Sequence, residues 1–323
     1  MTRNFVKAVL SVFMLTALPA LAHAQIPNTC DFDGDGKTDP VVVRNTGGGS
    51  TGQITWYISK SAGGMTFVPW GIATDFFLCG DYDADGKSDV TVWRSGAAGT
   101  AGFWVLKSSN GAALFEPFGQ TGDDPQVVGD YDGDGRDDFA VYRAGANVGN
   151  QSYLFYRTTQ GGAVAYVPWG LNGDFSAPLD FDGDGKHDPM VQRNGGGGQA
   201  HNWIRQSSNG ATALRTFGTP TDYLVPGNYD GDLTEDLAVG RGAAGQIQWW
   251  TLGTSTGVIS LSIFGASATD FITQGDWDGD GTTDIGIWRP GTGQFWTRGS
   301  TVGVRVLKWG QNGDYPVNNT RRK

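Results

Sequence analysis

Six copies of one acidic motif constrain the fold of this chain more than any other feature. The first copy reads Asp-Phe-Asp-Gly-Asp-Gly-Lys-Thr-Asp over residues 31–39, and the next five begin at intervals of 50, 49, 50, 48 and 48 residues. An arginine follows the last aspartate of each copy by five residues, and an aromatic-Gly pair precedes the next copy. Three markers that recur in a fixed order indicate a tandem array of one structural unit. The arginines are Arg44, Arg94, Arg143, Arg193, Arg241 and Arg289.

Local patterns predict four short strands in each copy. In the second copy these are residues 76–80, 89–94, 102–107 and 113–118. Glycine supplies 52 of 323 residues, which favours tight turns over long helices. Short strands that recur at this spacing are typical of propeller blades, and one blade cannot bury both of its faces alone. The sequence therefore predicts an all-β fold, a six-bladed β-propeller of four-stranded antiparallel blades.

The ring also has to close. Prolines in the first strand of most copies predict an edge position next to the central channel, because proline cannot donate to a ladder. Residues 314–318 repeat that first strand once more, so either 26–30 or 315–318 could complete the first blade. We expect the C-terminal strand to do so, because Asn28 and Thr29 make the N-terminal segment a poor strand. The propeller domain spans 25–318, with repeats at about 25–74, 75–123, 124–173, 174–221, 222–269 and 270–313, the closing strand at 314–318 and a polar tail at 319–323.

The acidic motif has the composition of a site for a hard cation. Carboxylates at positions one, three and five converge as the backbone wraps, glycine at position six permits the turn, and position nine closes the shell. The carbonyl at position seven adds another oxygen, and a ligand set made only of oxygen favours Ca²⁺. The predicted ligands are Asp31, Asp33, Asp35, Lys37 and Asp39; Asp81, Asp83, Asp85, Lys87 and Asp89; Asp130, Asp132, Asp134, Arg136 and Asp138; Asp180, Asp182, Asp184, Lys186 and Asp188; Asn228, Asp230, Asp232, Thr234 and Asp236; and Asp276, Asp278, Asp280, Thr282 and Asp284.

The alternative is a set of solvated Asp-Gly turns, which are common in hairpins. Against it, these loops hold 23 of the 33 acidic residues, and such clustering is destabilising without a cation. We therefore expect up to six Ca²⁺ ions, which act mainly in structure. The fifth loop is the weakest candidate, since Asn228 replaces the first aspartate and Leu233 replaces the glycine.

The loop resembles the start of an EF-hand, but valines such as Val42 stand where an EF-hand has its bidentate glutamate. Over residues 25–318 the chain instead resembles bacterial FG-GAP/VCBS-repeat proteins, which are related to integrin α-subunit propellers and to some fungal lectins. This resemblance implies a propeller with Ca²⁺ in the loops after the innermost strands. Integrin propellers usually have seven blades, whereas this chain has six copies.

The first residues have the pattern of a signal peptide. Arg3 and Lys7 precede an apolar run, and Ala22-His23-Ala24 matches a cleavage site, which predicts a leader over 1–24 and a mature start at Gln25. A retained membrane anchor is the alternative. We expect a soluble protein, secreted to the extracellular space or the periplasm, without membrane insertion. Cys30 and Cys79 hold nearly equivalent positions in adjacent copies, so they could form an inter-blade disulfide in that oxidising compartment.

Binding is a better expectation than catalysis. The formal charge of −10 provides no basic face for nucleic acid. After the leader only His187 and His201 remain, and His187 is expected to be an exposed loop residue rather than a base. We expect a monomeric, non-enzymatic module for carbohydrate or an extracellular protein; the alternative is a polysaccharide lyase or glycosidase. Recurring aromatics are predicted to pack between blades rather than to stack on sugars, and the repeated arginines to be structural. These aromatics are Trp56, Trp104, Trp203, Trp250 and Trp296.

Overall fold

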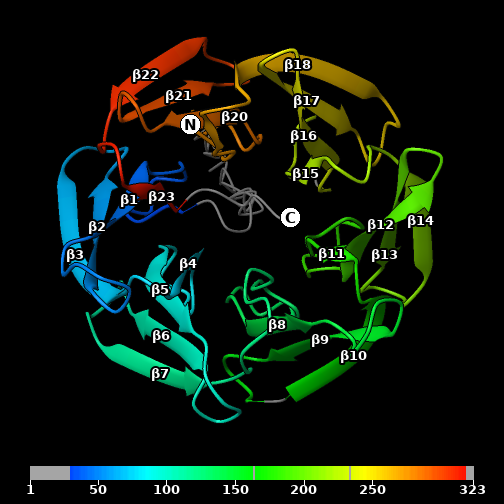
Figure 1. Ribbon diagram of the computed structural model, residues 1–323, viewed down its shortest axis with the longest axis horizontal. Coiled ribbons are helices and arrows are strands. Elements are labelled where there is room, and N and C mark those ends of the chain that lie inside the picture. Colours follow the sequence, from blue (N-terminus) through cyan, green and yellow to red (C-terminus); the bar gives the residue numbers. More distant parts are fainter. Residues whose placement is uncertain (1–29, 163, 233, 318–323) are drawn as a thin grey trace, which may run out of the picture.

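The computed structural model describes residues 30–162, 164–232 and 234–317. Within these residues the chain forms six small antiparallel sheets, which stand as blades in a ring around a central axis (Figure 1). The predicted six-bladed β-propeller is confirmed. None of the described residues forms a helix long and apolar enough to cross a membrane.

Each blade runs from an innermost strand at the axis to an outermost strand at the rim. Blade one contains β23 (Tyr315–Pro316), β1 (Val41–Asn45), β2 (Gln53–Ser59) and β3 (Met65–Ile72); blade two contains β4 (Phe76–Gly80), β5 (Asp89–Arg94), β6 (Gly102–Leu106) and β7 (Ala113–Pro117). Blade three contains β8 (Phe139–Arg143), β9 (Gln151–Arg157) and β10 (Val164–Leu171); blade four contains β11 (Phe175–Ser176), β12 (Met190–Gly196), β13 (Gln199–Arg205) and β14 (Thr212–Thr216). Blade five contains β15 (Tyr223–Leu224), β16 (Leu237–Ala243), β17 (Gln246–Leu252) and β18 (Ile259–Ala266); blade six contains β19 (Phe271–Ile272), β20 (Ile285–Arg289), β21 (Gln294–Arg298) and β22 (Val304–Lys308).

Except in blade two, the innermost segment is the shortest or least regular part of its blade. The four strands predicted for the second copy agree with β4 to β7 within one residue. Blade three has three regular strands, and its innermost segment is held by isolated bridges from Asp124 to Tyr142 and from Gly129 to Asp138. Pro125 lies in that segment and cannot donate to the ladder, which contributes to its irregularity.

The C-terminal strand closes the ring, as predicted. In β23, Pro316 and Tyr315 pair with Val42 and Val43 of β1, and the Val317 N–H donates to the Val41 carbonyl at 3.1 Å. Blade one is thus completed by a strand from the other end of the chain, and in Figure 1 β23 lies beside β1. Residues 26–29 and Asn318, which the prediction also named, lie outside the described residues.

The core lies between the blades. Consecutive residues Val41, Val42 and Val43 are all buried, because neighbouring blades cover both faces of an inner strand. The outermost strands instead alternate between exposed and half-buried side chains, as in β7 and β10. Apolar burial therefore joins adjacent blades to each other, and each blade depends on its neighbours.

Six buried ion pairs repeat around the ring. The arginine at the end of each second strand donates from Nε and Nη2 to one aspartate, as Arg94 does to Asp75 at 2.8 Å for both bonds. The aspartate side chains are almost fully buried, and the pair between Arg44 and Asp314 adds a second contact to the closure. The structural role expected for the arginines is confirmed. In the third copy the partner of Arg143 is Asp123.

The two cysteines form a disulfide between adjacent blades. Cys30 precedes the first acidic loop and Cys79 lies in β4, with 5.2 Å between their Cα atoms. The predicted Cys30–Cys79 pairing is confirmed, and it links blade one to blade two near the axis.

Candidate metal centres

In blades two to six the acidic loop connects the innermost segment of the blade to the next strand outward, and in blade one it directly precedes β1. The six loops therefore lie together on one face of the ring, close to the axis (Figure 1). The opposite face carries the Arg–Asp pairs, which lie at the other ends of the same second strands.

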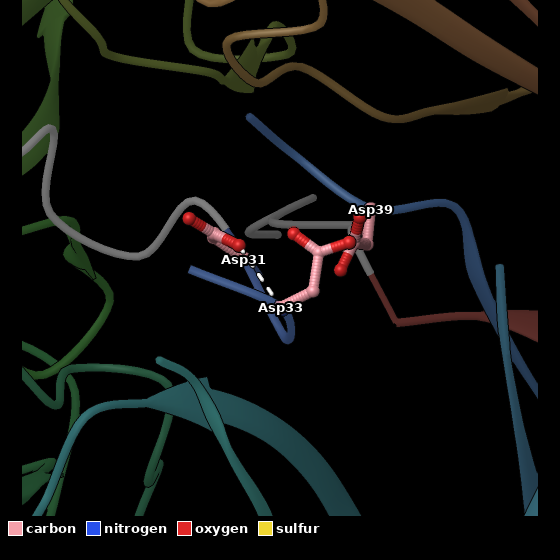
Figure 2. Close-up of side chains that lie close together, drawn as sticks. All are labelled: Asp31, Asp33 and Asp39. Carbon is pink, nitrogen blue, oxygen red and sulfur yellow. Dashed lines mark hydrogen bonds between the residues drawn. The ribbon is translucent and has the colours of Figure 1, made fainter. Parts of the chain in front are cut away.

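The loops bring carboxylates together in the predicted way. In four loops the oxygens of positions one, three and nine lie within 4.8 Å of one another, and Figure 2 shows this for Asp31, Asp33 and Asp39. In loop two the corresponding group is formed by positions one, three and five. The groups are Asp31, Asp33 and Asp39; Asp81, Asp83 and Asp85; Asp130, Asp132 and Asp138; Asp180, Asp182 and Asp188; and Asp276, Asp278 and Asp284.

The first aspartate of each loop organises the turn around itself. Asp31 accepts hydrogen bonds from the N–H groups of Gly34 at 2.7 Å and Gly36 at 2.8 Å. Both glycines have a left-handed backbone, with φ of 80° and 83°. Loop two has Ala84 at position four with φ of 58°, a conformation that is unfavourable for a residue with a Cβ atom. The wrapped loop thus uses the conformational freedom of glycine at two positions.

The carboxylate at the ninth position is buried in every loop. Asp39 is fully buried and accepts from the N–H of Phe32 at 2.8 Å and of Ser61 at 2.6 Å. Burial raises the pKa of Asp39 to about 6, despite these hydrogen bonds. Burial likewise raises the pKa of Asp138, Asp188 and Asp284 to about 7. A nearby cation would favour the charged form of these groups, because it offsets the cost of their burial.

One oxygen at the third position has no hydrogen-bond donor in four of the loops. These buried atoms are the Oδ1 atoms of Asp33, Asp83, Asp182 and Asp278, and none has a partner among the described residues. A buried carboxylate oxygen without a donor is destabilising unless a cation satisfies it. The clustered residues therefore fit a bound cation, and every atom that they offer as a metal ligand is an oxygen.

A second turn, which the sequence reasoning missed, covers each loop. It connects the third and fourth strands of the blade and carries serine or threonine, as in Ser108-Ser109. The Ser108 hydroxyl donates to Asp85 at 2.9 Å, the Ser109 hydroxyl to Asp83 at 2.6 Å, and the Ser108 N–H to Asp89 at 2.7 Å. In the other five blades a main-chain N–H of this turn likewise donates to the ninth-position aspartate; the donors are Ser61, Thr159, Ser207, Thr254 and Ser300. The sequence signal was a hydroxyl residue 16 to 22 positions after each ninth-position aspartate.

Positions five and seven have a different arrangement. In loop one Asp35 lies outside the cluster and accepts from the N–H of Lys37 at 3.0 Å and the hydroxyl of Ser61 at 2.8 Å. The Lys37 side chain extends over Gly279 of loop six, so this lysine reaches the preceding acidic loop. A role for the seventh-position carbonyls as ligands stays a prediction.

In loop five a side-chain amide forms hydrogen bonds within the loop, at the place where the other loops bring carboxylates to face one another. The Asn228 side-chain amide donates to the Asp232 carbonyl at 2.7 Å, and its oxygen accepts from the Gly231 N–H at 2.8 Å. No acidic cluster was found among the described residues of this loop, and Leu233 lies outside them. The weakness expected for the fifth site thus has a structural counterpart.

A closed cycle of main-chain hydrogen bonds joins the six loops. The N–H at position eight of each loop donates to the carbonyl at position one of the preceding loop, as from Ser88 to Asp31 at 2.6 Å. The other donors are Thr38, Asp137, His187, Glu235 and Thr283, at 2.6–2.8 Å, and the acceptor of Thr38 is Asp276 of loop six. His187 is only 2% exposed, so its expected exposure was wrong. It packs against Gly129, where a Cβ atom would lie 2.2 Å from the imidazole ring.

The aromatics form a repeated contact with the arginines. Arg94 lies over Trp104, Arg241 over Trp250 and Arg289 over Trp296, with 5.3–5.6 Å from guanidinium carbon to ring centre. Trp203 is half-buried at the equivalent place in β13. Trp56 is out of register, because Tyr57 occupies that place under Arg44. Trp56 instead lies fully buried in the core between blades one and two.

Comparison with known proteins gives a repeat family and a fold. The FG-GAP repeat family matches residues 25–55. No curated protein sequence matches the chain. One similar solved structure is AofleA from Arthrobotrys oligospora, with 12% sequence identity and a TM-score of 0.54; the match covers 91% of this chain and 90% of that chain. Another is TolB from Acinetobacter baumannii, with 13% sequence identity and a TM-score of 0.52; the match covers 90% of this chain and 68% of that chain. At these identities the likeness shows the fold alone. The repeat match and the six-bladed ring together support an FG-GAP β-propeller.

Proposed function

We propose that this chain is an exported, non-catalytic binding module whose propeller is stabilised by Ca²⁺ in loops one, two, three, four and six. The orphaned Oδ1 atoms at position three carry the metal proposal, because they are buried acceptors without donors. Clusters made of carboxylate oxygen favour Ca²⁺ over Zn²⁺, and Ca²⁺ accepts a more variable coordination geometry than Mg²⁺ does. Loop five would remain without metal.

The metal would act on the joints between blades. A cation at loop one would hold Asp31, whose carbonyl accepts the hydrogen bond from Ser88 of loop two. The same relation recurs around the cycle of six, so each bound ion would stabilise its own blade and a joint. For extracellular sites with dissociation constants of about 10⁻⁴ to 10⁻³ M, millimolar Ca²⁺ adds about 0.4 to 1.4 kcal/mol per site. Five sites would then contribute about 2 to 7 kcal/mol, a large part of a typical folding free energy.

Thermal unfolding tests this proposal. We expect the melting temperature to fall by about 10 °C or more when EGTA replaces 1 mM CaCl₂, and titration calorimetry to count five sites. Addition of MgCl₂ to the chelated protein is the control and should restore little of the loss. An unchanged melting temperature in EGTA would refute the proposal.

The proposed ligand-binding role is supported by what the titratable groups already do. The clustered carboxylates hold their own loops, and His187 is buried at a joint. A carbohydrate or an extracellular protein would bind elsewhere on the ring, where the copies differ. Export to the extracellular space or the periplasm is consistent with the disulfide and with the leader-like residues 1–24. Turnover of a polysaccharide by the purified protein would overturn the non-catalytic part of the proposal.

A further inference from the structure

One position of the second strand holds different residue types in different blades. It stands just before the conserved arginine in the second strand and is Val43, Trp93, Tyr142, Gln192, Gly240 or Trp288. Trp93 and Trp288 are fully buried. Their Nε1 groups donate to the carbonyls of the aromatic-Gly pairs, to Phe118 at 3.0 Å and Trp309 at 3.1 Å. In these two blades the ring fills the joint and satisfies a carbonyl.

Blade five satisfies the same carbonyl from the neighbouring strand. Gly240 pairs with Trp249 of β17, and the Trp249 Nε1 donates to the Phe264 carbonyl at 2.9 Å. In blades two and six the residue opposite the tryptophan is a phenylalanine, Phe103 or Phe295. The donor has therefore moved across the sheet in blade five. Where blades two and six have an indole ring, Gly240 has no side chain, and the Ile272 Cδ1 lies against its backbone.

A cavity of about 400 Å³ lies at this place, between blades five and six. Its walls include Tyr223, Arg241, Ser267, Asp270 and Ile272 and the turn at 243–245. It lies at the arginine end of β16, on the face opposite the acidic loops. Its volume is within the range of about 300–1,000 Å³ that is usual for small-molecule sites.

The charges around the cavity are already paired. Asp222 receives two bonds from Arg241, at 2.8 and 2.7 Å, and Asp270 receives two from Arg289 at the same distances. Burial acts to raise the pKa of Asp222, but bonds from Arg241 and Thr219 outweigh it and lower the pKa. Both aspartates are therefore held as carboxylates whose charge is matched, and neither offers a free charge to an ionic ligand.

Apart from the partly exposed guanidinium of Arg241, whose charge is matched by Asp222, the surface open to a ligand is uncharged and amphipathic. Tyr223 supplies a half-buried ring, Ile272 an apolar wall, and Ser267 with the turn main chain supplies hydrogen-bonding groups. A neutral sugar matches this combination, because it carries hydroxyls at its edge and C–H groups on its face. We propose that the cavity beside Gly240 binds a neutral saccharide unit. This inference rests on the proposed role as a binding module.

The chain itself supplies the variant that tests the site. The double substitution Gly240→Trp and Trp249→Phe copies the pair found in blades two and six, and it should fill the cavity while keeping a donor for the Phe264 carbonyl. A Cβ atom at Gly240 would lie 2.5 Å from the Ile272 Cδ1, which is the flexible end of a side chain. The matched control is Val43→Trp with Trp56→Phe, the same exchange in blade one.

The measurement begins with an array of neutral and charged oligosaccharides in 1 mM CaCl₂, and calorimetry follows with the best neutral binder. We expect at least a tenfold loss of affinity for the blade-five variant and for Tyr223→Ala, with unchanged affinity for the blade-one control. Tyr223→Ala gives an answer even if the double variant does not fold. The proposal fails if no neutral saccharide binds, if only charged glycans or proteins bind, or if Tyr223→Ala retains full affinity. The EGTA melt separates these failures from failure of the calcium scaffold.

Discussion

Loops one and five show two ways of stabilising the same turn. In loop one, three carboxylates face one another and an oxygen of Asp33 has no donor. In loop five, the Asn228 amide donates to a carbonyl within its own loop. The difference is between a site that fits a cation and a turn that supplies its own hydrogen bonds. The fit to a cation therefore differs from loop to loop, and the side chain at position one is one of the places where loops one and five differ.

The joints between blades do not share this difference. Both loops take part in the main-chain cycle through the carbonyls of Asp31 and Asn228. Both blades also carry the buried pair, Arg44 with Asp314 and Arg241 with Asp222. Loop five can thus lose the features of a metal site while blade five keeps its place in the ring.

The largest expected effect is the pH dependence of the metal-free protein. Burial raises the pKa of Asp138, Asp188 and Asp284 to about 7, so the folded chain holds protons that the unfolded chain releases at about pH 4. The free energy of unfolding in EGTA should therefore fall as pH rises from about 4 to 7. Urea unfolding at several pH values measures this. In CaCl₂ the part of the fall that comes from these three aspartates should disappear. The part from Asp137 and Glu235, whose pKa burial raises to about 7 and about 8, should remain. Equal slopes in both buffers would contradict the proposed metal sites in loops three, four and six.

The next effect concerns the buried Arg–Asp pair, which is present in every blade. Arg94→Met and Arg241→Met each leave a buried aspartate without its partner, and each should lower the free energy of unfolding by about 3–5 kcal/mol. Urea unfolding in CaCl₂ measures both. Arg305→Met on the exposed strand β22 is the control and should change stability little. A much smaller loss in blade five would show that its joint differs as well as its loop.

A single substitution should convert loop two toward the type of loop five. Asp81→Asn removes one carboxylate from its cluster, and calorimetry should then count four Ca²⁺ ions instead of five. The loss of stability in 1 mM CaCl₂ should be about 0.4–1.4 kcal/mol, the contribution of one site. In EGTA the variant should be no less stable than the parent chain. An unchanged ion count would mean that position one does not decide occupancy.

The reverse substitution should have the smallest effect. Asn228→Asp removes the amide that donates to the Asp232 carbonyl, so stability in EGTA should decrease slightly. In CaCl₂ a sixth ion should bind weakly and offset that decrease. Calorimetry gives the ion count, and paired melts give the two stabilities. A count that stays at five would show that other residues of loop five also prevent binding.

Most of the fold was predictable because the repeat is long and regular. The strands of blade two, the closure by β23 and the acidic clusters follow from local patterns and from the requirement that edge strands be paired. The covering Ser108-Ser109 turn was missed, because hydroxyl residues in Gly-rich turns are common and their target lies across the blade. The burial of His187 was missed because its neighbour, Gly129, belongs to another copy.

The sequence by itself determined the number of blades and the position of the acidic loops, and it placed the two cysteines at nearly equivalent positions of adjacent copies. Each of these depends on the spacing of a motif, and that spacing can be read from the sequence because the copies follow one another at nearly constant intervals. Only the tertiary structure decided that position eight ties each loop to the one before it, and that Gly240 leaves a cavity while Trp249 takes over the hydrogen bond. These features arise where two copies meet, and their geometry depends on how blades pack rather than on the pattern within any one copy.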